Sequence, residues 1–452
     1  MGLSKSTKHI ILGSLSILGG CLHKIALSSV TTLLNFYPYL LSYLHKYHPN
    51  YIIEQGYFLI PVYTITTFLF APIGGFLDSK LGMFKAIIIG VLLLLSAAFV
   101  MFISTNYYLD FISIILYGIG IGVSSMLSPK NACKYFFEKK GMVNAIIASL
   151  GSIGGGLYNL AGEMLINPKS IGTTGGFYPF EIAEKIKYYL LFQMCTVAII
   201  VFVALVLIVP HDDSKNIMKD KINSIEPILD SPVLNEECLQ EEVNIPNQNN
   251  QEYSIVHIKK AVTSWRAWRL FLLCFLSSFI IIMISTTYRS VGIALDRSTK
   301  VIQAIGTLRF VVNCICTPIW GVLTDFLNYR IILLMINIGC AALGYLYYFC
   351  LFSNFTFFVG SLMESVLLAG LMATIAPHIM KVFGMKYYIE IGGVIAFGFA
   401  LGTVFSTIVS YLVTSILNNS KFGFFLMYVI GGGMATVAAV LGLFEDDREF
   451  EY

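Results

Sequence analysis

The chain has 452 residues, of which 57% are hydrophobic and 12% are charged, and its formal net charge is +3. A water-soluble protein of this length could not hide so much apolar surface, because its exterior must be largely polar. The small net charge is spread over loops, which excludes the basic surface of a nucleic-acid-binding protein. Apolar stretches of about 20 residues recur, and each can cross a hydrocarbon core. The composition therefore predicts an all-α, multi-pass protein of the lipid bilayer.

Twelve apolar stretches are long enough to span a membrane, six on each side of a polar central segment. We expect them near 10–44, 53–79, 84–104, 107–136, 141–166, 183–209, 267–295, 300–325, 329–350, 355–382, 388–417 and 421–443. The central segment is rich in Asp, Glu and Asn and cannot bury enough apolar surface to offset its ordering entropy, which predicts a flexible linker. We therefore expect six-helix bundles at 1–210 and 263–444, a cytoplasmic linker at 211–262 and an acidic cytoplasmic tail at 445–452.

Two internal echoes indicate that the bundles are pseudo-symmetric copies. The hairpin GGFLDSKLGMFK at Gly74–Lys85 returns as GVLTDFLNYR at Gly321–Arg330, each with Gly, three residues and Asp before a basic residue. The stretches Ser128–Met142 and Ala376–Met385 both place Pro before Lys, then Phe, then Gly-Met at the start of a span. Repeated features at corresponding places in two halves are typical of duplicated transporters.

Basic residues in short loops favour an orientation with both termini in the cytoplasm. The expected inner loops hold Lys80, Lys85, Lys139, Lys140 and Arg330, and the outer loops hold fewer basic residues. The basic start of the chain precedes an apolar segment too long for a cleavable signal. We expect a plasma or organelle membrane, a monomer and contact with lipid but not with nucleic acid.

The sequence offers no pattern for a metal, a cofactor or an enzyme reaction. The nine cysteines form no CxxC motif and no Cys/His cluster, so we expect neither zinc nor disulfides. No Walker loop, nucleophile elbow, HExxH or paired-carboxylate motif stands in a loop. Without an ATP-binding domain, any transport must draw on a gradient.

Six plus six helices, a central loop and the Gly-x-x-x-Asp hairpin resemble the major facilitator superfamily over essentially the whole chain. The hairpin departs from the usual order, because Ser79 separates Asp78 from Lys80 and Asn328 stands where a Gly is common. The resemblance implies two six-helix bundles and alternating access. It also implies that helices 1, 4, 7 and 10 line the cavity, with 2, 5, 8 and 11 beside them.

The segment Tyr117–Gly155 resembles helices 4 and 5 of the oxalate/formate antiporter and monocarboxylate transporter group. Asn35–Leu44 and Tyr387–Gly402 are similar to that group as well. Its members typically carry an Arg in helix 8 that binds the substrate carboxylate, and here Thr317 stands at that place. Oxalate exchangers add a Lys in helix 11, where this chain aligns Phe397. The usual two-cation dicarboxylate site is therefore absent, which argues against oxalate and weakens, without removing, the case for a monocarboxylate.

Ionisable groups deep in a bilayer are costly, so each one is a candidate for substrate binding or coupling. Arg309, Asn313 and Thr317 follow each other at intervals of four residues and form a polar stripe that we expect to face water. Arg309 could bind a carboxylate through its planar fork, or could pair with Glu364 or snorkel as a structural ion. The other candidates inside the spans are Lys24, His23, Arg289 and Glu364.

The alternatives for the helix 1 residues stay open. Lys24 could bind substrate or take part in proton coupling, or could pair with a helix carbonyl or with Glu163. His23 could relay protons because histidine titrates near neutral pH, or could be a hydrogen-bonded packing residue. At the cytoplasmic gate we place Asp78, Lys80, Lys85, Asp325 and Arg330, with the acids clamping helix ends through the helix dipole.

The sequence as a whole predicts a secondary active transporter that moves a small, monocarboxylate-like organic anion, coupled to protons, by alternating access. The first alternative is the same fold carrying an amino acid or another neutral or zwitterionic solute, which needs fewer fixed cations. A non-transporting membrane sensor is the third candidate. It would need a large folded cytoplasmic domain, and the central segment is too short and polar for one.

Overall fold

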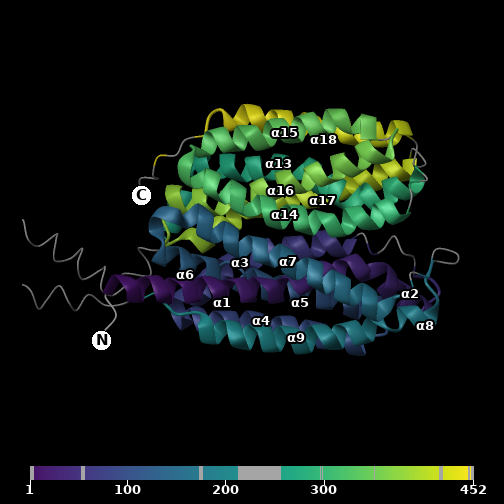
Figure 1. The fold of residues 1–452 in the computed structure, drawn as a ribbon, viewed down its shortest axis with the longest axis horizontal. Coiled ribbons are helices and arrows are strands. Elements are labelled where there is room, and N and C mark those ends of the chain that lie inside the picture. Colours follow the sequence, from purple (N-terminus) through teal and green to yellow (C-terminus); the bar gives the residue numbers. More distant parts are fainter. Residues whose placement is uncertain are drawn as a thin grey trace, which may run out of the picture.

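The helices form two groups that lie side by side, one from each half of the chain (Figure 1). The computed structural model describes residues 5–51, 56, 58–169, 171–172, 177–211, 256–295, 297, 299–350, 352–416, 421–445 and 448. The start of α1 (Lys5–Leu33) and the end of α18 (Lys421–Gly442) lie at the same end of the molecule, and α2 (Tyr37–Tyr47) and α8 (Phe180–Ala183) lie at the opposite end (Figure 1). Most of the expected linker, residues 212–255, falls outside the described residues, whereas 256–262 are helical.

The first half contains nine α-helices and two short 3-10 turns among its described residues. They are α1 (Lys5–Leu33), η1 (Leu34–Phe36), α2 (Tyr37–Tyr47), α3 (Leu59–Leu81), α4 (Met83–Ile103), α5 (Tyr107–Ser124), α6 (Leu127–Tyr135), η3 (Phe137–Lys139), α7 (Lys140–Ile166), α8 (Phe180–Ala183) and α9 (Ile186–Leu207). The second half contains α13 (Trp265–Ala294), α14 (Thr299–Phe326), α15 (Tyr329–Cys350), α16 (Asn354–Val382), α17 (Tyr388–Ile416) and α18 (Lys421–Gly442).

Twelve helical segments of the described chain are long and apolar enough to cross a membrane, which confirms the predicted spans. Proline divides two of them. In the first span, Pro38 lies in the first turn of α2, where the lack of an N–H costs nothing, and the helix before it ends in a 3-10 turn. In the fourth span α5 ends at Ser124, and Pro129 lies in the first turn of α6.

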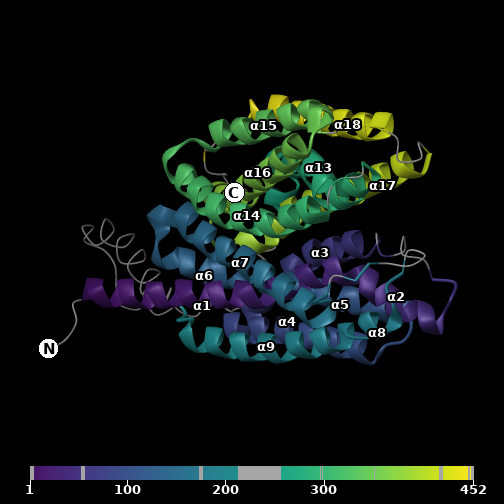
Figure 2. The same cartoon turned by 45° about the vertical axis from the view of Figure 1, so that its right-hand side comes forward.

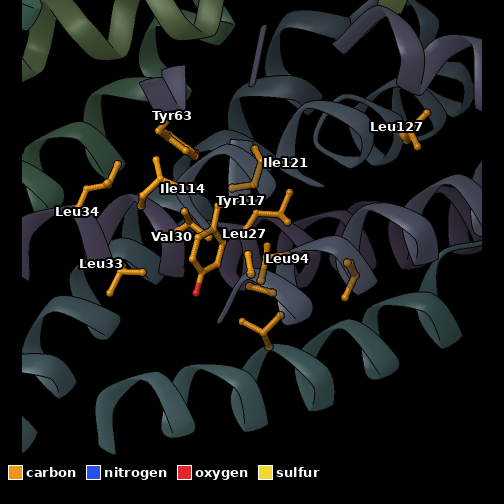
Figure 3. Packing of buried hydrophobic residues seen from close by; sticks show 14 of the residues in the cluster. Leu27, Val30, Leu33, Leu34, Tyr63, Leu94, Ile114, Tyr117, Ile121 and Leu127 are labelled. Atoms are coloured by element: carbon orange, nitrogen blue, oxygen red, sulfur yellow. The ribbon is translucent and has the colours of Figure 1, made fainter. Parts of the chain in front are cut away.

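Each bundle packs around an apolar core, while many large apolar side chains point outward. In the first half, Leu27 and Val30 of α1 meet Tyr117 and Ile121 of α5 (Figure 3). On the outside of α9, by contrast, Phe202 is 71% exposed. Apolar surface on both the inside and the outside of a bundle is what a lipid environment requires, because no water solvates the exterior.

Glycines allow the tightest helix crossings. A Cβ atom on Gly122 of α5 would overlap the backbone of α3 at Thr67, and one on Gly398 of α17 would overlap the backbone of α13 at Phe271. Small residues at such crossings let helix backbones approach closely in membranes. Gly82, which follows α3, has a φ of +84°, a conformation that other residues adopt only with strain.

The two halves meet along α7 and α14 on one side and along α3 and α17 on the other (Figure 2). At the end near the chain termini this contact is very close. A Cβ atom on Gly321 of α14 would lie 2.7 Å from the carbonyl oxygen of Gly141 in α7. Likewise, a Cβ atom on Gly393 of α17 would lie 2.6 Å from the ring of Pro72 in α3. The halves are therefore closed against each other at this end.

Candidate functional site

A cavity of about 460 Å³ lies between the two halves. Its wall in the first half is formed by Thr31, Leu34, Asn35, Tyr37, Pro38, Ile60, Tyr63, Thr64, Thr67, Phe68, Asn159 and Glu163. The second half contributes Ile282, Ser285, Thr286, Tyr288, Ile302, Gly306, Thr307, Phe310, Phe399 and Thr403. These residues belong to the parts of their helices nearer to α2 and α8, away from the closed end. Aromatic faces interleaved with hydroxyl groups suit a small amphipathic solute.

The cavity wall differs from the expected one in the helices that form it. It is built by α1, η1 and α2 of the first span and by α3, α7, α13, α14 and α17. The fourth span (α5 and α6) and the tenth span (α16) were expected to line the cavity, and neither contributes a wall residue. The tenth span still takes part in the site, because Glu364 and Ser365 of α16 bind a residue directly behind the wall.

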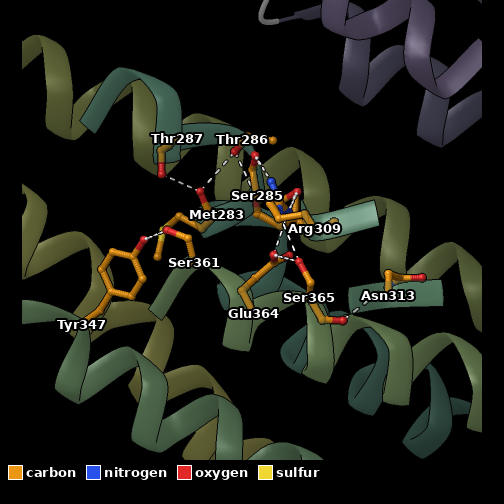
Figure 4. Close-up of polar contacts among 11 residues, drawn as sticks. Met283, Ser285, Thr286, Thr287, Arg309, Asn313, Tyr347, Ser361, Glu364 and Ser365 are labelled. Atoms are coloured by element: carbon orange, nitrogen blue, oxygen red, sulfur yellow. Dashed lines mark hydrogen bonds and ion pairs between the residues drawn. The ribbon is translucent and has the colours of Figure 1, made fainter. Parts of the chain in front are cut away.

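That residue is Arg309 of α14, whose guanidinium joins three helices (Figure 4). Its Nη2 lies 2.6 Å from Oε2 of Glu364, and the same nitrogen donates to Ser285 Oγ of α13 at 2.6 Å. Nη1 donates to the Ser285 carbonyl oxygen at 3.2 Å, and Nε donates to Ser365 Oγ at 3.2 Å. Of the alternatives that the sequence left open for Arg309, the structure shows the ion pair with Glu364. Charge-assisted bonds of this kind are the strong ones.

Glu364 is completely buried, and only one of its two carboxylate oxygens accepts hydrogen bonds from described residues. The side chain has 0% exposure, and Oε1 has no hydrogen-bond partner among the described residues. A buried carboxylate with an unpaired oxygen is costly as an anion. The contact with Arg309 and the Ser365 hydroxyl, which donates to Oε2 at 3.2 Å, are the interactions that compensate it.

The rest of the expected polar stripe is packed between helices and does not face water. Asn313 accepts a hydrogen bond from Ser152 Oγ of α7 at 2.6 Å, and its Nδ2 lies 3.5 Å from the Ser365 carbonyl. Thr317 is 1% exposed and donates to the Asn313 carbonyl at 2.6 Å. The four-residue spacing keeps the three side chains on one face of α14, but that face is turned to α7 and α16.

Lys24 and His23 of α1 have different surroundings. Lys24 is half-buried and makes no hydrogen bond or ion pair with any described residue, Glu163 included. It lies two helical turns, about 10 Å, from Thr31 on the same face, and Thr31 lines the cavity. His23 is fully buried, and its Nδ1 lies 2.9 Å from Ser128 Oγ of α6. In the structure His23 therefore has the surroundings of a hydrogen-bonded packing residue.

Arg289 belongs to α13, and its side chain lies outside the described part of the chain. The neighbouring Tyr288 lines the cavity, and its ring centre lies 5.0 Å from the Arg309 guanidinium carbon. Sequence reasoning missed Tyr288, Ser285 and Ser365. Only their position beside Arg309 in space marks them, because a Ser or Tyr in an apolar span is an ordinary packing residue.

At the closed end, Asp325 holds the two halves together. Its Oδ1 and Oδ2 each accept a hydrogen bond of 2.9 Å, from the backbone N–H groups of Gly141 and Met142. These amides belong to the first turn of α7, where unpaired donors and the helix dipole favour an anion. The expected clamping of a helix end is therefore the contact that Asp325 makes.

Asp78, the counterpart in the first half, makes a different contact. It accepts from Lys130 Nζ of α6 at 2.9 Å, and Lys130 is itself buried. Glu390 of α17, which sequence reasoning missed, abuts Gly75 on α3 from the other half. An acid near the start of the eleventh span was the signal in the sequence that could have found it.

The three basic gate candidates lie at helix ends and point outward. Lys80, Lys85 and Arg330 are exposed and make no ion pair with any described residue, although Lys80 Nζ lies 4.4 Å from the Phe76 ring centre. None of them bridges the halves in this conformation. Exposed lysines and arginines at a membrane edge are stable without partners, because water solvates them.

The start of the expected acidic tail is anchored in the second bundle. Glu445 is 3% exposed, accepts from Arg269 Nε at 2.7 Å and lies 3.4 Å from His378 Nε2. Burial raises the pKa of this carboxyl, but the hydrogen bonds from His378 and Arg269 outweigh it, so the pKa of Glu445 lies below its ordinary value. His378 in turn stacks on Tyr329, with ring centres 3.6 Å apart.

Twelve helical segments of the described chain are long and apolar enough to cross a membrane, and they form two six-helix halves around a central cavity, an arrangement typical of membrane transporters. A family model described as Major Facilitator Superfamily matches residues 21–296 and 270–451. The chain belongs to the Major Facilitator Superfamily. It is a transporter and not an enzyme.

Two curated relatives are similar over part of the chain. The apicoplast pyruvate carrier 1 of Toxoplasma gondii is 22% identical over 280 residues, which are 56% of this chain and 50% of that carrier. The agnestins efflux protein AgnL12 of Paecilomyces divaricatus is 31% identical over 103 residues, 23% of this chain and 24% of that protein. The chain therefore spans about half the length of one relative and about a quarter of the other.

Solved structures share the fold over nearly the whole chain. The human organic anion transporter MFSD10 (TETRAN) superposes with a TM-score of 0.67 at 12% identity, covering 96% of this chain and 99% of that one. The proton:xylose symporter XylE gives 0.66 at 15% identity, with 96% and 95% covered. The E. coli fucose:proton symporter FucP gives 0.62 at 15% identity, with 96% and 98% covered. At these identities the likeness establishes the fold alone.

Proposed function

We propose that this chain is a secondary active transporter that carries a small, monocarboxylate-like organic anion together with a proton. The observation that carries the proposal is the buried pair of Arg309 and Glu364, directly behind the wall of the central cavity. The similarity to a pyruvate carrier supports an anion of this class. Thr317 does not bind the carboxylate in this proposal, because it is buried and its hydroxyl donates to the helix backbone.

The pair can couple an anion to a proton because only one charge can balance the guanidinium at a time. When Glu364 is ionised, it occupies Nη2 of Arg309 at 2.6 Å. Protonation of Glu364 would leave a buried cation without its counter-ion, which is strongly unfavourable. A substrate carboxylate can then replace Glu364 on the guanidinium fork. Binding of the proton and binding of the anion therefore favour each other.

Lys24 supplies a second cation in the proposal, on the opposite half of the molecule. It lies on the same face of α1 as Thr31, further from α2 and α8, and has no described partner. A carboxylate that moves past the cavity would meet Lys24 when the halves rock. With both termini in the cytoplasm, as the loop charges favour, the end that is closed in this conformation is the cytoplasmic one. The proposal also includes a plasma or organelle membrane, both termini in the cytoplasm and a monomeric state. It places the six-helix bundles at 1–210 and 263–444.

The test is uptake of labelled pyruvate or lactate into proteoliposomes, with and without an inward proton gradient. We expect the gradient to stimulate uptake in the natural sequence and Arg309→Lys to abolish it, because an ammonium cannot reproduce the bidentate fork. Glu364→Gln should lose accumulation against a gradient yet keep exchange of labelled for unlabelled substrate. Glu138→Gln and Lys169→Gln, both at exposed positions, are matched controls. The proposal would be overturned if uptake were the same with and without the proton gradient, or if Glu364→Gln protein still accumulated substrate.

One observation favours a zwitterionic solute as the second candidate. Glu163 lines the cavity, where it accepts from Asn159 Nδ2 at 3.3 Å, whereas Arg309 is not part of the wall. An acid in the wall suits the ammonium group of an amino acid, whose carboxylate could still reach Arg309. Competition separates the two: a neutral amino acid that displaces labelled lactate, and loses this ability in Glu163→Gln protein, would identify the zwitterion as substrate.

A further inference from the structure

Tyr288 lines the cavity and also contacts the Arg309 guanidinium. Tyr288 and Ser285 of α13 line the cavity, and so do Gly306 and Phe310 on either side of Arg309 in α14, but Arg309 itself does not. The guanidinium carbon of Arg309 lies 5.0 Å from the centre of the Tyr288 ring, within the range of a cation–π contact. Tyr288 is therefore in contact both with the space that a solute would occupy and with the guanidinium.

The guanidinium has one donor left for a solute. Nε, Nη1 and Nη2 make four hydrogen bonds to Ser365, Ser285 and Glu364, and an arginine carries five N–H groups. The second N–H of Nη1 has no partner among the described residues. A carboxylate that reached this N–H would bind the fork as soon as Glu364 released Nη2.

Contacts that are easy to break hold the Tyr288 ring in place. Its hydroxyl makes no hydrogen bond with any residue that the structure describes, and the side chain is only half-buried. The hydroxyl rests over Gly306, where a Cβ atom would lie 3.1 Å from it. The missing side chain at Gly306 therefore leaves room for the tyrosine. A ring held by packing and a cation–π contact can turn aside without leaving a buried polar group unpaired.

We propose that Tyr288 is a movable cover over Arg309, which a substrate carboxylate must displace before it binds the guanidinium. This inference rests on the proposed function of Arg309. Displacement places the Tyr288 hydroxyl, which has no other described partner, within the cavity as a hydrogen-bond donor to the arriving anion. The cover also keeps chloride and other small anions from Arg309, because they lack the apolar body that would pack against the displaced ring. Tyr288 is thus a specificity-determining residue.

The experiment measures the reactivity of Arg309 without any transport. Purified protein in proteoliposomes is treated with phenylglyoxal, an arginine reagent, and modification of the peptide that contains Arg309 is followed over time by mass spectrometry. In Tyr288→Ala protein the rate should rise by roughly an order of magnitude, in line with the loss of a desolvated cation–π contact. Tyr288→Phe keeps the ring and should react as slowly as the natural sequence. Tyr63→Ala, which enlarges the cavity from the opposite half, is the matched control.

Three results would overturn the cover: equal Arg309 reactivity in Tyr288→Ala and natural protein, fast reaction in Tyr288→Phe, or an equal increase in Tyr63→Ala. Thermal unfolding of each variant identifies a general loss of structure, and Tyr288→Phe serves where Tyr288→Ala does not fold. Uptake separates this proposal from the proposed function. If Arg309→Lys protein still transports lactate, the proposed function of Arg309 fails. If Arg309→Lys protein loses uptake but Arg309 in Tyr288→Ala protein reacts no faster than in the natural sequence, only the cover is contradicted.

Discussion

Arg309 and Glu364 meet at 2.6 Å across α14 and α16, although 55 positions separate them in the chain. The contact lies in the second bundle, with the carboxylate fully buried and the arginine side chain 14% exposed. Ser285 of a third helix binds the same guanidinium. One arginine thus connects three helices immediately behind the cavity wall. A movement of its guanidinium would therefore change both the site and the packing of the second bundle.

Removal of Arg309 should destabilise the fold through the acid that it leaves behind. Arg309→Ala leaves Glu364 buried and unpaired, which costs about 3–5 kcal/mol at neutral pH. The double variant Arg309→Ala/Glu364→Gln should recover most of this loss, because a neutral amide needs no counter-ion. Thermal unfolding of the natural protein, both single variants and the double variant in detergent measures the coupling. Additive effects would show that the two side chains do not stabilise each other.

Lys24 should matter for transport but not for stability. Lys24→Gln removes the second cation of the proposed transport path, so we expect uptake to fall to about a tenth. The unfolding temperature should stay equal or rise, because a cation without a counter-ion inside the membrane is costly. Lys187 is the contrasting lysine, since its Nζ donates to the carbonyl oxygens of Met101 and Phe102 and, at 2.8 Å, to that of Ser104. Lys187→Gln should lower the unfolding temperature. Normal uptake in Lys24→Gln protein would remove Lys24 from the transport path.

Asp325 should hold the closed end shut. Asp325→Asn leaves one acceptor oxygen for the two backbone N–H groups of α7, because the NH2 group that replaces the second oxygen can only donate, a loss of about 1.5–3 kcal/mol. Hydrogen–deuterium exchange should then speed up at Gly141 and Met142, which donate these bonds, and the closed end should open more often. Asp78→Asn is the control, because Asp78 accepts its hydrogen bond from Lys130 of α6 and makes none with α7 among the described residues. Unchanged exchange in Asp325→Asn protein would contradict this role.

Glu445 should make stability depend on pH in the acidic range. The pKa of this carboxyl lies below its ordinary value, so ionised Glu445 stabilises the folded state at neutral pH. That contribution is present above the pKa of the unfolded state and is lost as the pH falls through the lower folded pKa. The unfolding temperature of natural protein should exceed that of Glu445→Gln at about pH 7, and the gap should close below about pH 4. A gap that is independent of pH would show that packing, not charge, anchors the residue.

The sequence predicted the helices well and their side-chain partners only in part. Apolar stretches show their length directly, which is why the span from Tyr329 to Cys350 was expected at 329–350 and is found there. The start of the second span at Leu59 was expected near 53, because apolar and aromatic residues precede the helix. Asp325 was expected to bind a helix end and does so, since an acid in a hairpin repeat has few other roles.

The site itself depended on information that the sequence does not carry. Arg309, Asn313 and Thr317 share one face of α14, as their spacing predicts, but spacing alone does not tell which neighbour that face meets. The face meets Ser152 of α7 and Ser365 of α16, so it is packed instead of wet. For the same reason Tyr288 could not be recognised, because its importance lies entirely in its position over Arg309.

By itself the sequence determined the class of protein: twelve helices in two related halves, embedded in lipid. The physical reason is local, since about 20 apolar residues cross a bilayer whatever the rest of the chain does. Only the tertiary structure decided which charges meet, which helices enclose the cavity and which end is closed. These properties depend on contacts between residues far apart in the chain, such as Arg309 with Glu364 and Asp325 with Gly141. Such contacts are set by the packing of whole helices and not by any local pattern.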